Sequence, residues 1–163
     1  MKNLLLTILT FFVISFANAQ SFKGHTSGTI GILNAKIRLQ YEIPIGDKFS
    51  TGANINYYFV NWTGPLIEPF SRYYVSEGNK SGGFFQLKAG YGNLSSLNFT
   101  SKRLSIFGGG VAWGYKCLKK SGFTIEPIIG VRVYSNPEWN DAIGWFLTTG
   151  FPIDCQLKFG YQF

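Results

Sequence analysis

The sequence has few of the residues that build catalytic or metal sites. It contains one histidine, two cysteines and one methionine in 163 residues, too few ligands for a zinc site. Charged residues make up 14% of the chain, against about 25% in ordinary soluble domains. The net charge is +7, yet no basic tract or basic and aromatic platform marks a nucleic-acid surface. We therefore expect no metal, no cofactor and no nucleic-acid partner.

Apolar runs long enough for a membrane helix are also missing. Lys2 precedes an apolar stretch at 4–16, and small residues at 17–19 follow it. This stretch is shorter than the roughly 20 residues that a spanning helix needs. We interpret 1–19 as a cleaved signal peptide, with an uncleaved anchor as the alternative, and 20–163 as one domain.

What the chain does have is a hydrophobic period of two, which predicts strands with one apolar and one polar face. The alternation is unbroken from 151 to 163, and no charged residue falls on the apolar face of any strand segment. An even strand number is usual in single-chain bacterial barrels, so an eighth strand has to come from 21–31, which we favour, or from 142–150. The other segments are 33–43, 49–59, 67–75, 85–91, 107–117 and 123–133.

This pattern predicts an all-β fold, an antiparallel up-and-down transmembrane β-barrel of eight strands. Closed strands satisfy every backbone group in lipid, and a basic side chain on the lipid face costs roughly 2–4 kcal/mol at the bilayer midplane. A soluble calycin-like binding barrel with the apolar face inside is the alternative. Glycines on the polar face favour the membrane barrel, where they leave room for long charged neighbours; they are Gly52, Gly90, Gly108, Gly110, Gly114, Gly130 and Gly160.

Loop lengths predict the direction of the strands. Short connections at 44–47, 77–82 and 118–122 are typical of the periplasmic side, and longer ones at 92–102 and 135–150 of the outside. Phe163 then lies at the periplasmic rim.

Three residue types on these strands carry further expectations. Pro69 and Pro127 lack a ladder donor, so we expect bulges or rim positions there. Cys117 and Cys155 fall near opposite ends of the barrel and are expected to be free, lipid-facing thiols, with a disulfide as the alternative. Ten aromatic residues near strand ends suggest interfacial girdles; they are Tyr57, Tyr58, Phe59, Trp62, Tyr73, Tyr74, Tyr91, Trp113, Tyr115 and Tyr161.

The polar face forms the candidate site, a charge network in the barrel interior. A barrel of eight strands is just wide enough to be filled by side chains, and buried charge needs a partner. We expect Glu68 and Glu126 to pair with Arg72 and Arg132 across the barrel. A plug of ion pairs is the main interpretation, and a narrow anion-preferring pore is the alternative. The network comprises Lys36, Arg38, Glu42, Glu68, Arg72, Lys88, Lys116, Glu126, Arg132, Asp154 and Lys158.

Several short segments resemble the small outer-membrane β-barrel proteins of Gram-negative bacteria, a largely uncharacterised group that includes the porin family. The resemblance implies export, insertion by the barrel assembly machinery, and contact with outer-membrane lipid and lipopolysaccharide. The assembly signal would be Phe159, Tyr161 and Phe163 in the last strand. The matching segments are 39–42, 49–53, 69–74, 83–85, 90–92, 122–124 and 157–163.

The resemblance implies no activity, so we expect a non-enzymatic outer-membrane protein with a structural or surface-interaction role. Surface contacts would fall to the segments 93–102 and 135–150. A lipid A-modifying enzyme is a less favoured alternative, because His25 beside Thr26 and Ser27 has no recognisable acid partner and nucleophilic catalysis needs one. We expect His25 to be an ordinary solvated histidine.

Overall fold

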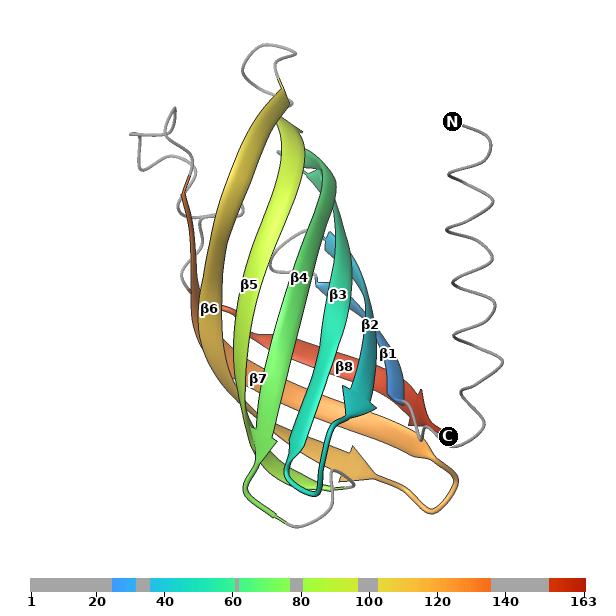
Figure 1. The fold of residues 1–163 in the computed structure, drawn as a ribbon. Helices are drawn as coiled ribbons and strands as arrows, with labels where there is room; N and C mark the ends of the chain where they lie inside the picture. Colours follow the sequence, from blue (N-terminus) through green and yellow to red (C-terminus); the bar gives the residue numbers. More distant parts are fainter. Residues whose placement is uncertain (1–24, 32–35, 61, 77–80, 97–102, 136–152) are drawn as a thin grey trace, which may run out of the picture.

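The computed structural model describes residues 25–31, 36–60, 62–76, 81–96, 103–135 and 153–163. Eight strands form a closed antiparallel barrel in chain order (Figure 1), which confirms the predicted up-and-down architecture. The described residues include no helix that is long and apolar enough to cross a membrane. The strands are β1 His25–Gly31, β2 Lys36–Pro44, β3 Phe49–Val60, β4 Trp62–Tyr74, β5 Gly82–Ser96, β6 Arg103–Leu118, β7 Phe123–Ser135 and β8 Gln156–Gln162.

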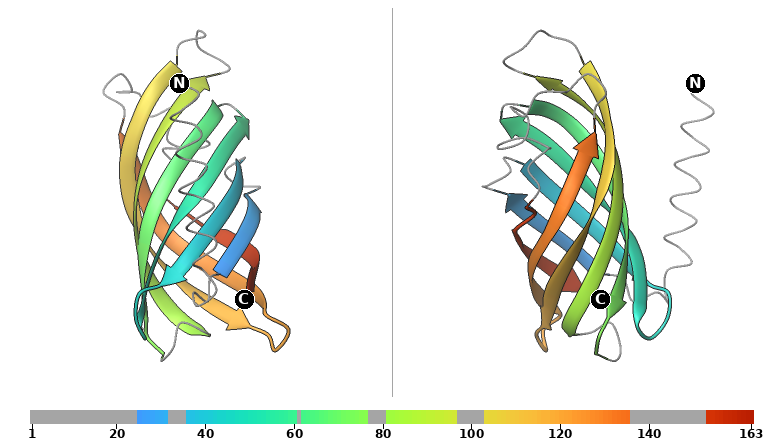
Figure 2. Two further views of the ribbon diagram at one scale, coloured as in Figure 1. Left: turned by 45° about the vertical axis from the view of Figure 1, so that its right-hand side comes forward. Right: turned by 90° about the vertical axis from the view of Figure 1, so that its left-hand side faces the viewer.

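The eighth strand comes from the N-terminal stretch, as favoured from the sequence. β1 pairs with β2 from His25 to Gly31 and closes the barrel on β8 from His25 to Gly28. Figure 2 shows β1 and β8 side by side on one wall of the barrel, and each strand has seven residues. The predicted signal peptide 1–19 and the alternative strand 142–150 lie outside the described residues. So does the predicted outer loop 135–150, apart from Ser135, which ends β7.

Several predicted strand boundaries are wrong. β4 begins at Trp62 and β6 at Arg103, five and four residues before the predicted starts. β5 continues to Ser96, so the first five residues of the expected loop 92–102 are strand. There Leu94 points inward and Asn93 outward, which reverses the polarity of the rest of the strand. A prediction based on apolar outward positions therefore ended the strand too early. The last strand begins later than expected, at Gln156, although Ile153 still forms a bridge with Val131 in the same register.

The expected bulges at the strand prolines are absent from the described strands. Pairing of β4 with β5 skips Pro69 but has the same register on both sides, from Ile67↔Tyr91 to Phe70↔Lys88. Pro127 likewise interrupts only the β6 side of its strand, while it pairs with Leu157 on the β8 side. A proline removes a single donor, and these two positions lose hydrogen bonds on one side without shifting the strand.

The outer face of the barrel carries the apolar side chains, and the inner face carries the charged ones. Large apolar residues such as Leu87, Val111 and Leu157 are at least half exposed, whereas the charged residues of the polar face are buried. This arrangement contradicts the soluble alternative, which requires the apolar face inside. Two candidates for the aromatic girdle also prove wrong, because Tyr58 and Tyr74 point into the barrel; for Trp62 the described structure places the backbone only.

The tight connections and the C-terminus lie at one end of the barrel, here called the turn end (Figure 1). The β2–β3 turn is closed by the Ile45 amide on the Phe49 carbonyl at 2.9 Å, and Gln162 N–H donates to the Gly122 carbonyl at 2.9 Å. Gly122 has φ +86°, a conformation that glycine adopts readily. Phe163 therefore follows β8 at the end expected from the sequence. Both cysteines are free thiols, Cys117 exposed and Cys155 half-buried.

Candidate functional site: the barrel interior

The interior brings together all eleven charged residues expected there. Each is at most 3% exposed. Ten of them form two groups along the barrel axis, and Lys158 belongs to neither group. The three aromatic residues of the expected assembly signal, Phe159, Tyr161 and Phe163, are instead exposed on the outside. The candidate site is therefore a polar core enclosed by the sheet, with most of its charged residues on β2, β4 and β7.

The first group, the turn-end cluster, consists of His25, Glu42, Arg72, Lys116 and Glu126. Arg72 joins two carboxylates across the barrel, with Nη1 at 2.7 Å from Glu42 Oε2 and Nη2 at 3.0 Å from Glu126 Oε2. Lys116 Nζ lies 3.3 Å from the same Glu42 oxygen. Tyr74 OH donates to Glu42 at 2.6 Å, and Ser50 donates to it as well. Two acids and two bases thus neutralise each other here, as buried charges require.

His25 is part of this cluster, so the expectation of a solvated histidine is wrong. Its Nδ1 lies 3.1 Å from Glu42 Oε2 and its Nε2 lies 2.8 Å from Thr124 Oγ1. The Thr124 hydroxyl, the His25 imidazole and the Glu42 carboxylate follow one another as in a catalytic triad. Glu42 and Thr124 were not recognisable from the sequence as partners of His25, because they lie on other strands. Thr124 is completely buried and Glu42 is already paired with Arg72, so the contacts tie strands together.

The same residues form the one grouping of potential metal ligands in the described part of the chain. Atoms of His25, Glu42 and Glu126 all lie within 4.8 Å of one another. Arg72 and Lys116, however, already hold both carboxylates. A divalent cation there would add uncompensated positive charge to a buried site. The geometry favours an ion-pair network over a metal centre.

The second group, the far-end cluster, is built around Glu68 and Asp154. Glu68 accepts from Arg38 Nη2 at 2.6 Å and from Asn56 Nδ2 at 2.7 Å. Tyr134 OH and Lys88 Nζ reach its other oxygen, Oε1. Lys88 also bridges to Asp154, which accepts from Gln156 and has Lys36 Nζ at 3.8 Å. The remaining cation of this group, Arg132, donates to Tyr58 OH at 3.0 Å.

The expected pairing of the two glutamate and arginine motifs is confirmed in one case. Arg72 of β4 and Glu126 of β7 pair across the barrel. Glu68 pairs with Arg38 of β2, and Arg132 contacts Tyr58 instead. The alternation placed every one of these side chains inside, but it carries no information on which partner each reaches across the barrel.

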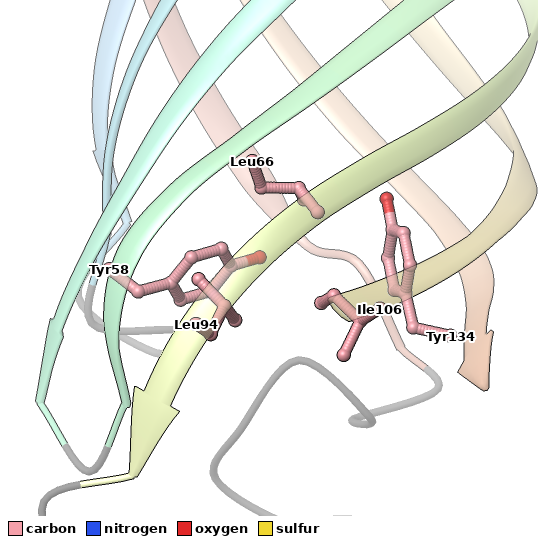
Figure 3. Close-up of a cluster of buried hydrophobic side chains, with 5 residues drawn as sticks. All are labelled: Tyr58, Leu66, Leu94, Ile106 and Tyr134. Carbon is pink, nitrogen blue, oxygen red and sulfur yellow. The ribbon is translucent and has the colours of Figure 1, made fainter. Parts of the chain in front are cut away.

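An apolar cluster, which the sequence did not reveal, closes the interior at the far end. Figure 3 shows its five side chains converging from β3, β4, β5, β6 and β7. Leu66 and Leu94 are completely buried, and Leu104 packs against the group. A second apolar cluster lies toward the turn end, where β4 ends and β5 begins, and contains Tyr74, Phe84, Ala112 and Ile128. The far-end apolar cluster comprises Tyr58, Leu66, Leu94, Ile106 and Tyr134.

The inward glycines lie against the backbone of neighbouring strands and against aromatic rings more often than against the charged neighbours expected. A Cβ at Gly52 would lie 2.7 Å from Phe70 Cζ, and one at Gly114 would lie 2.5 Å from Phe84 Cζ. Beside Gly110 the backbone of β7 approaches closely, with Val131 O at 2.3 Å from the ideal Cβ position. The interior is therefore packed, as expected for eight strands.

Fold and site together define a small closed β-barrel with an apolar exterior and an ion-paired, side-chain-filled interior. Comparisons with protein-family models, with curated proteins and with solved structures returned no match. The class of protein thus rests on the geometry of the chain itself.

Proposed function

We propose that the protein is an integral outer-membrane β-barrel of a Gram-negative bacterium with a non-enzymatic structural or surface-interaction role. In this proposal residues 1–19 direct export, and the aromatic last strand is recognised by the barrel assembly machinery. The observation that carries the proposal is the inversion of polarity between the two faces, with hydrocarbon side chains outside and ion pairs inside.

The outer face supports the membrane location. Exposed large apolar side chains occur on every described strand from β2 to β8, whereas a soluble monomer rarely exposes a continuous apolar patch of more than a few hundred Å². Among the outward-pointing strand residues whose side chains are described, a single one is charged. It is Arg103, the first residue of β6. Such exclusion of charge is what a hydrocarbon environment imposes.

The filled interior supports a structural role over transport. Arg72 crosses the barrel to Glu42 and Glu126, and the far-end apolar cluster covers the other end. A solute on this route has to break buried ion pairs, and breaking one costs several kcal/mol. The hydroxyl, imidazole and carboxylate of the turn-end cluster are buried, so a substrate has no approach to them in this arrangement.

Cell fractionation tests the membrane proposal. The full-length protein expressed in a Gram-negative host is expected in the outer-membrane fraction. After mild detergent extraction it should migrate on a gel faster when unheated than when boiled, because the closed barrel resists dodecyl sulfate. Recovery of folded protein in the soluble periplasmic fraction would contradict the outer-membrane location.

A narrow anion-preferring channel is the second candidate, favoured by the excess of basic over acidic side chains inside. Planar-bilayer recording of refolded protein separates the two. The proposed closed barrel gives no discrete conductance. Anion-selective steps that disappear in a Lys36→Gln, Arg38→Gln double variant would instead establish the channel.

A further inference from the structure

The inner wall between the two charged clusters carries a row of polar side chains without partners. Gln40 of β2 is the register partner of Ser27 on β1 and of Asn54 on β3. Ser27 Oγ, Gln40 Nε2 and both terminal atoms of the Asn54 amide are buried and have no hydrogen-bond partner. Register partners on one face lie about 5 Å apart at Cβ. The unpartnered groups thus gather at one place, here called the central row: Ser27, Gln40 and Asn54.

A buried cation stands beside the central row. Lys158 of β8 is 1% exposed, and its Nζ donates to Gln40 Oε1 at 2.5 Å. Lys158 forms no ion pair within the described part of the chain. Two residues further along β8, Gly160 faces Ser27. A Cβ there would lie 2.6 Å from Ser27 Cβ, so the glycine lets β1 and β8 approach closely. Glu126 is the register partner of Lys158 on β7, but it pairs with Arg72. Lys158 is therefore a buried ammonium whose hydrogen bond goes to a neutral amide oxygen, and it shares the one nearby carboxylate with other cations.

The orientation of Gln40 decides which kind of ligand the row accepts. Its Oε1 accepts from Lys158 and also from Arg72 Nη2 at 3.3 Å. Turning the amide over would place its N–H groups against two cations, so Nε2 is held as an unused donor. Glu68, which faces Asn54 in the register, has both oxygens occupied by other donors. The free hydrogen-bonding capacity at Gln40 and Lys158 is therefore that of donors.

We propose that the central row and Lys158 bind a small monovalent anion, a halide, inside the barrel. Gln40 Nε2, Asn54 Nδ2, the Ser27 hydroxyl and Lys158 Nζ supply its donors. The overall charge agrees, because the buried network holds three more basic than acidic side chains among the described residues. The turn-end cluster is internally balanced, so the excess lies with Lys158 and the far-end cluster. A bound anion would offset part of this excess positive charge and add to the ion-pair network that fills the interior. The proposal does not require that the barrel lies in a membrane.

The test measures the thermal midpoint of refolded protein in detergent at constant ionic strength, with chloride or bromide exchanged for gluconate, which is too large to enter. Halide is expected to raise the midpoint. The Gln40→Glu variant carries the negative charge covalently next to Lys158, so its midpoint should lose the halide dependence. Gln86→Glu is the matched control. Gln86 accepts from Arg72 Nε at 2.9 Å on another wall, and this variant should keep the dependence.

Crystals grown with bromide give the direct readout. The proposal predicts an anomalous bromine peak within hydrogen-bonding distance of Gln40 Nε2 and Lys158 Nζ, and no such peak in Gln40→Glu. Electron density there without anomalous signal means water only and overturns the proposal. A midpoint that ignores the anion in the wild-type protein, or responds equally in Gln40→Glu, overturns it too. Each of these outcomes is independent of whether the fractionation experiment finds the barrel in the outer membrane.

Discussion

His25 Nε2 lies 2.8 Å from Thr124 Oγ1 and thereby joins β1 to β7 over the intervening strand β8. The seam that it spans is short, because β1 and β8 pair only from His25 to Gly28. On its other side the imidazole contacts Glu42 of β2. A single side chain thus connects both neighbours of the closing strand pair.

Replacement of His25 by alanine is expected to destabilise the barrel by about 1–3 kcal/mol, since Glu42 and Thr124 each lose a buried partner. The measurement is the urea midpoint of refolded protein in detergent. Thr26→Ala, one residue along on the outer face, is the control and should change the midpoint little. Equal effects of the two substitutions would show that the imidazole contacts contribute nothing to closure.

Arg72→Met should be more damaging, by about 3–5 kcal/mol, because it leaves two buried carboxylates with one fewer cation. Combining it with Glu126→Gln removes one of those charges and should recover part of the loss. Unfolding by urea measures both variants. If the double variant is no more stable than Arg72→Met, the ion pair across the barrel is not what stabilises this end.

The hydrophobic period of two explains which features of this structure could be predicted from the sequence and which could not. Alternation fixes which face each residue joins, so the strands and all eleven interior charges were identified from the sequence. It does not encode which partner a side chain reaches across the barrel, and the Arg72 pair with Glu126 was found while the one expected for Arg132 was not. The far-end apolar cluster was missed because Leu94 and Ile106 reverse the pattern. Thr124 was missed because a hydroxyl in a strand carries no signal of its own.

A charge on the outer face discriminates between lipid and water. Leu87 is 64% exposed on β5, and Leu87→Arg should reduce the stability of the barrel in phospholipid vesicles by about 2–4 kcal/mol if the site lies near the midplane. Ser121→Arg, in the exposed β6–β7 turn, is the control and should be tolerated. A water-facing surface would accept both arginines equally.

The packing around the glycines predicts which glycine-to-alanine substitutions lower the stability of the barrel. A Cβ at Gly130 would lie 2.4 Å from the Val111 carbonyl oxygen and 2.5 Å from Ala112 Cβ, whereas nothing lies within 4 Å at Gly46. Gly130→Ala should therefore cost about 1–3 kcal/mol through overpacking, and Gly46→Ala should be close to neutral. Thermal midpoints of the two variants in detergent make the comparison. A neutral Gly130→Ala would mean that β6 and β7 are less closely packed than the structure shows.

The central claim, that the apolar face meets hydrocarbon, is tested most directly by spin labelling. A nitroxide attached to Leu87→Cys, in a Cys117→Ala, Cys155→Ala background, reports collisions with oxygen, which concentrates in lipid, and with a water-soluble nickel complex. For protein refolded into vesicles, a label in hydrocarbon should collide frequently with oxygen and almost never with nickel. Frequent nickel collisions at Leu87 would contradict the claim.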